Sequence, residues 1–162
     1  MLVRHVYICK TFVKNNKMAF LAGLLFITLL LLSGGYISDN PYLMEWTNDA
    51  RLAAAIMFVM IGTMHLIKPR KLAYMIEGWL PYAVALVIIT GVFEIIGGVG
   101  LLIPETREYA RWGLIILLVC MFPANIRVAV KHLPAPGGLP SKPWYTWSRL
   151  LFQPVYILWL LL

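Results

Sequence analysis

Residues 81–104 read PYAVALVIITGVFEIIGGVGLLIP and contain a single ionisable side chain, that of Glu94, near the middle. An apolar run of about twenty residues is long enough to cross a bilayer as a helix. A carboxylate in hydrocarbon costs roughly 2.5–3.5 kcal/mol on insertion scales unless it is protonated or paired. The stretch therefore predicts a membrane-spanning helix whose neighbours supply Glu94 with a partner, a cavity or a proton.

Glycines surround Glu94 in this stretch. Gly91 precedes it, and Gly97, Gly98 and Gly100 follow it. Glycine leaves the helix backbone bare, so another helix can approach closely. Two interpretations remain open: a helix packed through glycine with Glu94 as a buried hydrogen-bonding group, or a helix that lines a site for a small ligand or a proton.

The composition of the whole chain extends this prediction. Of 162 residues, 61% are hydrophobic and 13% are charged, whereas soluble domains are about 45–50% apolar and about 25% charged. The chain is therefore expected to be an integral membrane protein without a soluble domain. Its two cysteines, Cys9 and Cys120, form no C-x-x-C motif, which argues against a thiol-redox site of the usual kind.

Apolar segments separated by polar or proline-rich stretches predict five transmembrane helices. These are 18–35, 52–67, 81–104, 109–130 and 144–162. The fold class expected is an all-α membrane protein, with a four-helix transmembrane bundle in 52–162 and one additional N-terminal transmembrane helix. Residues 1–17 are basic with interleaved apolar residues and are expected to lie on the cytoplasmic membrane surface. Segments 36–51 and 131–143 are expected to be loops.

Positive charge predicts the orientation, because loops rich in Lys and Arg stay in the cytoplasm. The residues that an N-in arrangement places inside are Arg4, Lys10, Lys14, Lys17, Lys68, Arg70, Lys71, Arg127, Lys131 and Lys142. Only Arg51, Arg107 and Arg111 fall outside. We therefore expect a cytoplasmic N-terminus and an extracytoplasmic C-terminus.

Polar residues at membrane depth gather in one half of the predicted bundle. They are His65, Glu94, Asn125, Arg127, Arg149 and Gln153. Structural roles compete with binding roles at each position except Glu94: helix capping for His65, snorkelling for Arg127 and Arg149, and interhelical hydrogen bonds for Asn125 and Gln153. We expect Glu94, Arg149 and Gln153 to share one polar site inside the bundle, with the first helix packed outside it.

A stripe of methionines lies beside His65 on the second predicted helix. Met57, Met60 and Met64 share one face, and thioethers with imidazole suit Cu(I). Methionine is also an ordinary apolar filler, and core packing is the favoured interpretation. No metal site is therefore expected, and this set is the weak alternative.

From the second helix onward the chain resembles the DoxX-like family of small bacterial membrane proteins. The matching stretches are Gly62-Thr63-Met64-His65 with Lys68-Pro69, Trp79-Leu80-Pro81, Thr90 to Ile95, Gly98 to Arg107, Ala110 to Leu114, Phe122 to Ile126, and Arg149-Leu150 with Gln153 and Trp159. The resemblance implies a four-helix bundle in the bacterial inner membrane. It also implies a link to redox and sulfur functions, since the family is named after a membrane subunit of thiosulfate:quinone oxidoreductase. The polar positions shared with the family are His65, Glu94, Asn125, Arg149 and Gln153.

Three functions from different classes are compatible with these patterns. The first is a membrane subunit of a respiratory or redox-linked complex, without a catalytic centre of its own, that contacts quinone through the polar cluster. The second is an accessory or scaffold protein that stabilises a larger membrane assembly of other subunits and lipid. The third, a carrier of a small solute or ion, is disfavoured because no inverted repeat is visible. No motif predicts nucleic-acid binding.

Overall fold

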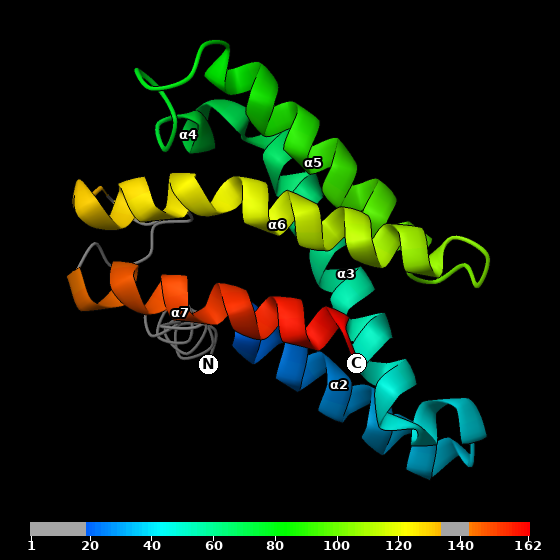
Figure 1. Cartoon of the computed structure of the whole chain (residues 1–162). Coiled ribbons are helices and arrows are strands. Elements are labelled where there is room, and N and C mark those ends of the chain that lie inside the picture. The colour runs from blue at the N-terminus through cyan, green and yellow to red at the C-terminus, as the bar shows by residue number, and fades with distance from the viewer. Residues whose placement is uncertain (1–18, 134–142) are drawn as a thin grey trace, which may run out of the picture.

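The computed structural model describes residues 19–133 and 143–162, apart from the side chains of residues 19, 143–145 and 149. These ranges are helical and contain no strand (Figure 1). The elements are α2 (Ala19–Ser38), the 3₁₀ helix η1 (Pro41–Met44), α3 (Trp46–Ile67), α4 (Pro69–Ala73), α5 (Ala83–Gly100), α6 (Arg107–Val130) and α7 (Pro143–Leu160). The predicted surface segment 1–17 lies outside the described residues.

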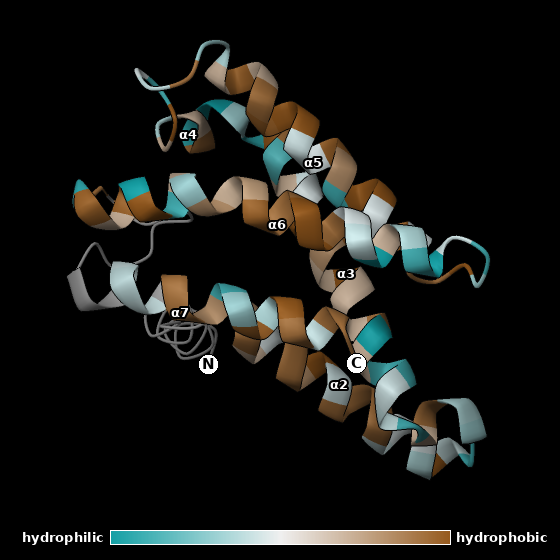
Figure 2. Cartoon of the chain, in the orientation of Figure 1, coloured by the Kyte–Doolittle hydropathy of each residue, from teal (hydrophilic) through white to brown (hydrophobic). Residues whose placement is uncertain are grey.

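Four of these helices, α2, α3, α5 and α6, are long and apolar enough to cross a membrane. Helix α7 is not among these four, and its sequence carries Arg149 and Gln153 between its apolar residues. Figure 2 shows the hydrophobic colouring along α2 and α5 and the more mixed surface of α7. The chain is thus an all-α, multi-pass membrane protein in which α3, α5, α6 and α7 form the bundle and α2 is the additional helix.

The helices pack as consecutive antiparallel neighbours with α3 at the centre. It packs closely against α5 on one side and against α2 on another, while α6 contacts both α5 and α7. The core is built from small residues of α3 (Ala53, Ala54) against larger ones such as Leu114 of α6 and Leu24 of α2. Alanine at the centre lets the surrounding helices approach closely.

The additional helix α2 is more deeply involved in the core than the sequence predicted. The Phe20 ring contacts Phe58 of α3 and Tyr156 of α7, at centroid distances of 5.8 and 4.4 Å. Leu24 and Thr28 are fully buried. The opposite face of α2 carries exposed apolar residues: Leu25, Phe26, Leu29 and Leu30. The helix therefore has one face for this bundle and one for lipid or another chain.

The predicted loop 36–51 is wrong at both ends. Helix α2 continues to Ser38, and α3 begins at Trp46, so that Asp49 lies within its first turn. An acidic side chain in the first turn stabilises a helix, because it interacts favourably with the positive end of the helix dipole. Between the helices, Asn40 accepts a hydrogen bond from the Tyr42 amide and so starts η1. The polar residues 46–51 belong to the N-terminus of α3, and the connection between the two helices is limited to residues 39–45.

Candidate functional site

Close backbone contact between α3 and α5 creates the site that holds Glu94. A Cβ added at Gly62 of α3 would lie 2.5 Å from the Gly91 carbonyl oxygen, and one added at Gly91 would lie 2.6 Å from His65 Cβ. Any larger side chain at either position would force the helices apart. Glycine at 62 and 91 thus brings the His65 and Glu94 side chains within reach of one another.

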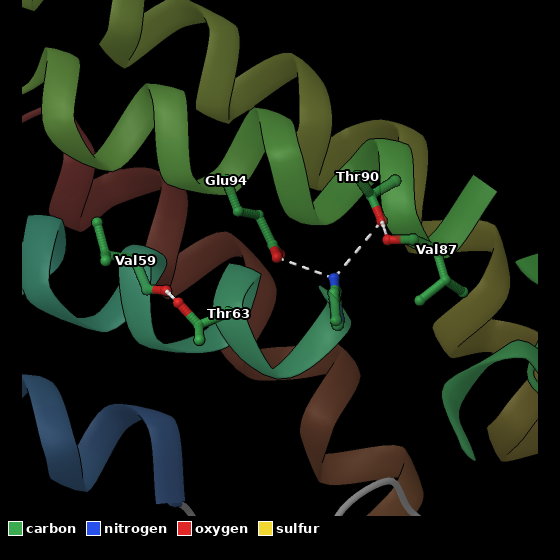
Figure 3. A network of polar contacts seen from close by, with 6 residues as sticks. Val59, Thr63, Val87, Thr90 and Glu94 are labelled. Carbon is green, nitrogen blue, oxygen red and sulfur yellow. Dashed lines mark hydrogen bonds and ion pairs between the residues drawn. The ribbon is translucent and has the colours of Figure 1, made fainter. Parts of the chain in front are cut away.

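The Glu94 and Thr90 side chains extend from α5 toward α3 at this contact (Figure 3). The Nδ1 atom of His65 lies 2.9 Å from Oε2 of Glu94. The Thr90 hydroxyl lies 3.5 Å from the same nitrogen and donates to the Val87 carbonyl at 2.9 Å. A histidine nitrogen is thus placed between a carboxylate and a hydroxyl, all within apolar helices.

The two members of the pair differ in exposure. Glu94 is only 2% exposed, and the His65 side chain is 18% exposed. The ring nitrogen is at ion-pair distance from Oε2, yet its direction does not make an aligned hydrogen bond, so Oε2 has no hydrogen-bond partner among the described residues. The short distance still allows electrostatic attraction, because Coulomb energy depends on separation. The pair is close, but Oε2 of Glu94 keeps an unused capacity to accept a hydrogen bond.

A second polar contact joins α6 and α7. Asn125 donates its Nδ2 to Oε1 of Gln153 at 3.1 Å, and Gln153 donates its own Nε2 to the Leu118 carbonyl. Gln153 is 4% exposed. Pro123 inside α6 has no backbone N–H and therefore removes the helical hydrogen bond to the Val119 carbonyl, not to that of Leu118. The interhelical hydrogen bond predicted as one role for Asn125 and Gln153 is confirmed.

The predicted site residues thus form two pairs on different helix interfaces. His65 and Glu94 meet between α3 and α5, whereas Asn125 and Gln153 meet between α6 and α7. We expected Glu94 and Gln153 to share one site. Among the described side chains, no direct contact joins these two residues. Arg149 lies on α7, but its side chain is outside the described part of the chain.

Arg127 does more than reach the membrane surface. Its guanidinium donates to the carbonyls of Met75 at 2.6 Å and Glu77 at 2.8 Å, and to that of Tyr74 at 3.3 Å. These carbonyls belong to the turns that follow α4. Arg127 thus ties α6 to the connection between α4 and α5, and its snorkelling to the membrane surface stays a prediction.

The methionine stripe divides between core and surface. Met57 is buried in the central cluster beside Gly23 of α2. Met60 and Met64 are 51% and 43% exposed. No group of three or more His, Cys, Asp or Glu side chains that could hold a metal occurs in the described ranges. The core-packing interpretation therefore holds for Met57.

Two polar residues were not singled out by the sequence pattern. Thr90 lies one turn before Glu94 on the same face, and this four-residue spacing is the signal that would have found it. Asp49 is fully buried in α3, and within the described part of the chain neither of its carboxylate oxygens has a hydrogen-bond partner. Its burial was hidden by the prediction that 36–51 is a loop.

The chain belongs to the family described as "Domain of unknown function (DUF8561)", whose model matches residues 54–162. The match begins within α3 and includes both polar pairs, and it excludes α2. No curated protein and no solved structure matches the chain.

Proposed function

We propose that this chain is a small integral membrane subunit of a respiratory or redox-linked complex, and that it contacts quinone through His65 and Glu94. The observation that carries the proposal is the 2.9 Å separation of His65 Nδ1 and Glu94 Oε2 inside apolar helices. A quinone site needs an apolar surface and one or two polar groups that exchange hydrogen bonds or a proton with the headgroup.

The pair has the charge properties that such a contact requires. A neutral histidine beside a protonated glutamate, and a protonated histidine beside a carboxylate, both carry zero net charge. Either state avoids most of the cost of an isolated carboxylate in hydrocarbon. In either state the pair holds one transferable proton. It could accept one of the two protons that a quinol releases on oxidation, which would leave a single positive charge on the pair, while the other proton would pass to water at the membrane surface.

The position of His65 supports access from the bilayer. Its side chain is partly exposed, while Glu94 behind it is buried. Leu66, the next residue, is 39% exposed and contacts the edge of the glycine interface, 3.5 Å from a Cβ built at Gly91. A lipid-soluble headgroup would therefore meet the imidazole first, with the carboxylate positioned to hold the proton.

The resemblance to DoxX-like proteins supports the quinone link and a bacterial inner membrane location. Under this proposal electrons pass between quinone and a redox centre on a partner subunit, and membrane lipids surround the rest of the bundle. Charge supports the N-in orientation: Lys68, Arg70 and Lys71 lie at the end of the bundle to which Arg127 is tied. Arg51 and Arg107 line one pocket at the other end.

Quinone binding to the protein in nanodiscs tests the proposal. His65→Leu and Glu94→Gln should each reduce the quinone retained after washing, measured by extraction and chromatography, by about tenfold or more if a charge-assisted hydrogen bond is lost. Thr63→Val is the matched control, because the Thr63 hydroxyl donates only to the Val59 carbonyl of its own helix. Equal retention by the wild type and both site variants would refute the quinone contact.

An accessory or scaffold role is the second candidate, favoured by the exposed face of α2. Phe26 is 67% exposed, and Leu29 and Leu30 are more than half exposed. Apolar residues on this face suit lipid and a protein partner equally in polarity. Phe26→Ser with Leu30→Ser should release partner subunits in a mild-detergent pull-down if the helix docks a partner, and should change nothing if it faces lipid alone.

A further inference from the structure

A small pocket lies at the other end of α3 from His65, about 20 Å away along the helix axis at 1.5 Å per residue. The start of α3, the start of α6 and the end of α7 surround it, and its lining includes Thr47, Arg51, Arg107, Arg111 and Trp159. The cavity itself is about 20 Å³, which is room for about one water. A larger group would therefore bind at its open mouth, where the arginine side chains lie.

The three arginines carry more positive charge than their partners neutralise. Arg51 donates to the neutral Asn48 side chain at 2.8 Å, and Arg107 donates to the Leu101 carbonyl at 3.4 Å. Arg111 forms an ion pair with Glu108 at 3.0 Å, and the Glu108 side chain is 64% exposed. Within the described residues, two of the three guanidinium groups therefore line the pocket without a carboxylate partner.

The helix dipole adds to this charge. Arg107 is the first residue of α6, where the partial charge of the helix is positive and a basic side chain is unfavourable. Thr106 does not cap this end with its side chain, because its hydroxyl donates to the Gly100 and Ile103 carbonyls instead. An anion at this position would relieve the repulsion among like charges and interact favourably with the helix N-terminus.

From this arrangement we infer that the pocket binds a phosphate group. Guanidinium groups bind phosphate oxygens in pairs and are the usual donors for this anion. Trp159 lines the same pocket, held by a hydrogen bond from its indole nitrogen to the Ala50 carbonyl at 2.9 Å. Tryptophan is enriched at the headgroup level of membranes. The phosphate comes either from an anionic phospholipid headgroup or from free inorganic phosphate.

Nanodiscs distinguish the two sources. The wild type is placed in phosphatidylcholine alone, in phosphatidylcholine with phosphatidylglycerol, and in phosphatidylcholine with millimolar inorganic phosphate. Native mass spectrometry counts the retained phosphatidylglycerol, and thermal unfolding reports stabilisation by either additive. Retained phosphatidylglycerol identifies a headgroup site, and stabilisation by inorganic phosphate in phosphatidylcholine alone identifies a free-phosphate site.

Arg51→Gln combined with Arg107→Gln should lower the retention of the anion that binds by about tenfold or more, because two charge-assisted contacts are lost. Arg70→Gln on the exposed surface of α4 is the matched control, since it removes the same charge at the other end of the bundle. Arg107→Lys keeps the charge without the paired geometry and should retain an intermediate amount, which guards against misfolding of the double variant. The absence of any anion effect on the wild type, or equal losses in the Arg70 control, would overturn the inference.

Discussion

The α6–α7 contact and the α3–α5 contact both place polar side chains at membrane depth, and they differ in how fully those side chains are bonded. Gln153 uses both ends of its amide, accepting from Asn125 and donating to the Leu118 carbonyl. Glu94 is as deeply buried, but within the described residues its Oε2 atom has a poorly aligned His65 nitrogen at 2.9 Å and no hydrogen-bond partner. A closed network holds helices together, whereas an incompletely bonded pair can bind something else.

The backbone explains why the α3–α5 pair stays incomplete. Gly62 and Gly91 bring the two helices into direct contact, so their separation is determined by backbone atoms rather than by the polar side chains. The α6–α7 contact is made through an asparagine and a glutamine whose amides match each other. Side-chain hydrogen bonds are thus optimised at one interface and subordinate to close packing at the other.

Adding a methyl group at Gly91 should have the largest effect on stability. The new Cβ would lie 2.6 Å from His65 Cβ and 2.9 Å from the Gly62 carbonyl oxygen, and overpacking of this kind typically costs about 1–3 kcal/mol. Gly91→Ala should lower the free energy of unfolding in detergent and also separate His65 from Glu94. Gly113→Ala is the control, because nothing lies within 4 Å of its Cβ position; equal destabilisation of both variants would contradict the close-contact argument.

Breaking the closed network should have the next largest effect. Gln153→Leu removes the donor to the Leu118 carbonyl and the acceptor for Asn125, and interhelical hydrogen bonds in membranes average about 0.6 kcal/mol and reach about 1.7 kcal/mol. We expect a loss of unfolding free energy of that size, measured by detergent titration. Quinone retention should be unchanged, and a parallel loss of quinone would show that the two polar pairs act as one site.

Glu94→Gln should show the opposite pattern. The amide conserves the shape of the carboxylate and leaves a donor for His65, so the unfolding free energy should change by less than about 1 kcal/mol. Quinone retention should fall strongly. A large loss of stability with normal quinone retention would instead assign the pair a purely structural role.

The smallest effect is expected from the exposed methionines beside the pair. Met60→Leu with Met64→Leu changes exposed positions, where substitutions usually alter stability by no more than about 0.5 kcal/mol. Neither stability nor quinone retention should change. Loss of stoichiometric Cu(I) binding in the double variant, measured by competition with a chromophoric chelator, would revive the metal alternative for Met57, Met60, Met64 and His65.

Much of the fold was predictable because membrane-spanning helices depend on local composition. Apolar length alone located α2, α3, α5 and α6 to within a few residues, except where the polar start of α3 was taken for a loop. That error also hid Asp49, whose burial depends on helices packed around α3 rather than on the residues adjacent to it in the chain. The role of Arg127 was missed for the same reason, since its carbonyl partners lie about fifty residues earlier in the chain.

By itself the sequence determined that this is an all-α membrane protein and that Glu94 requires a partner, because hydrocarbon tolerates neither open backbone nor an isolated carboxylate. The sequence also identified the polar residues that could pair with Glu94. Only the tertiary structure decided that His65 is that partner and that Gln153 belongs to a different pair. The choice depends on which helix faces approach each other. Among the described polar side chains, the glycine contact between α3 and α5 brings His65 alone within 3 Å of Glu94.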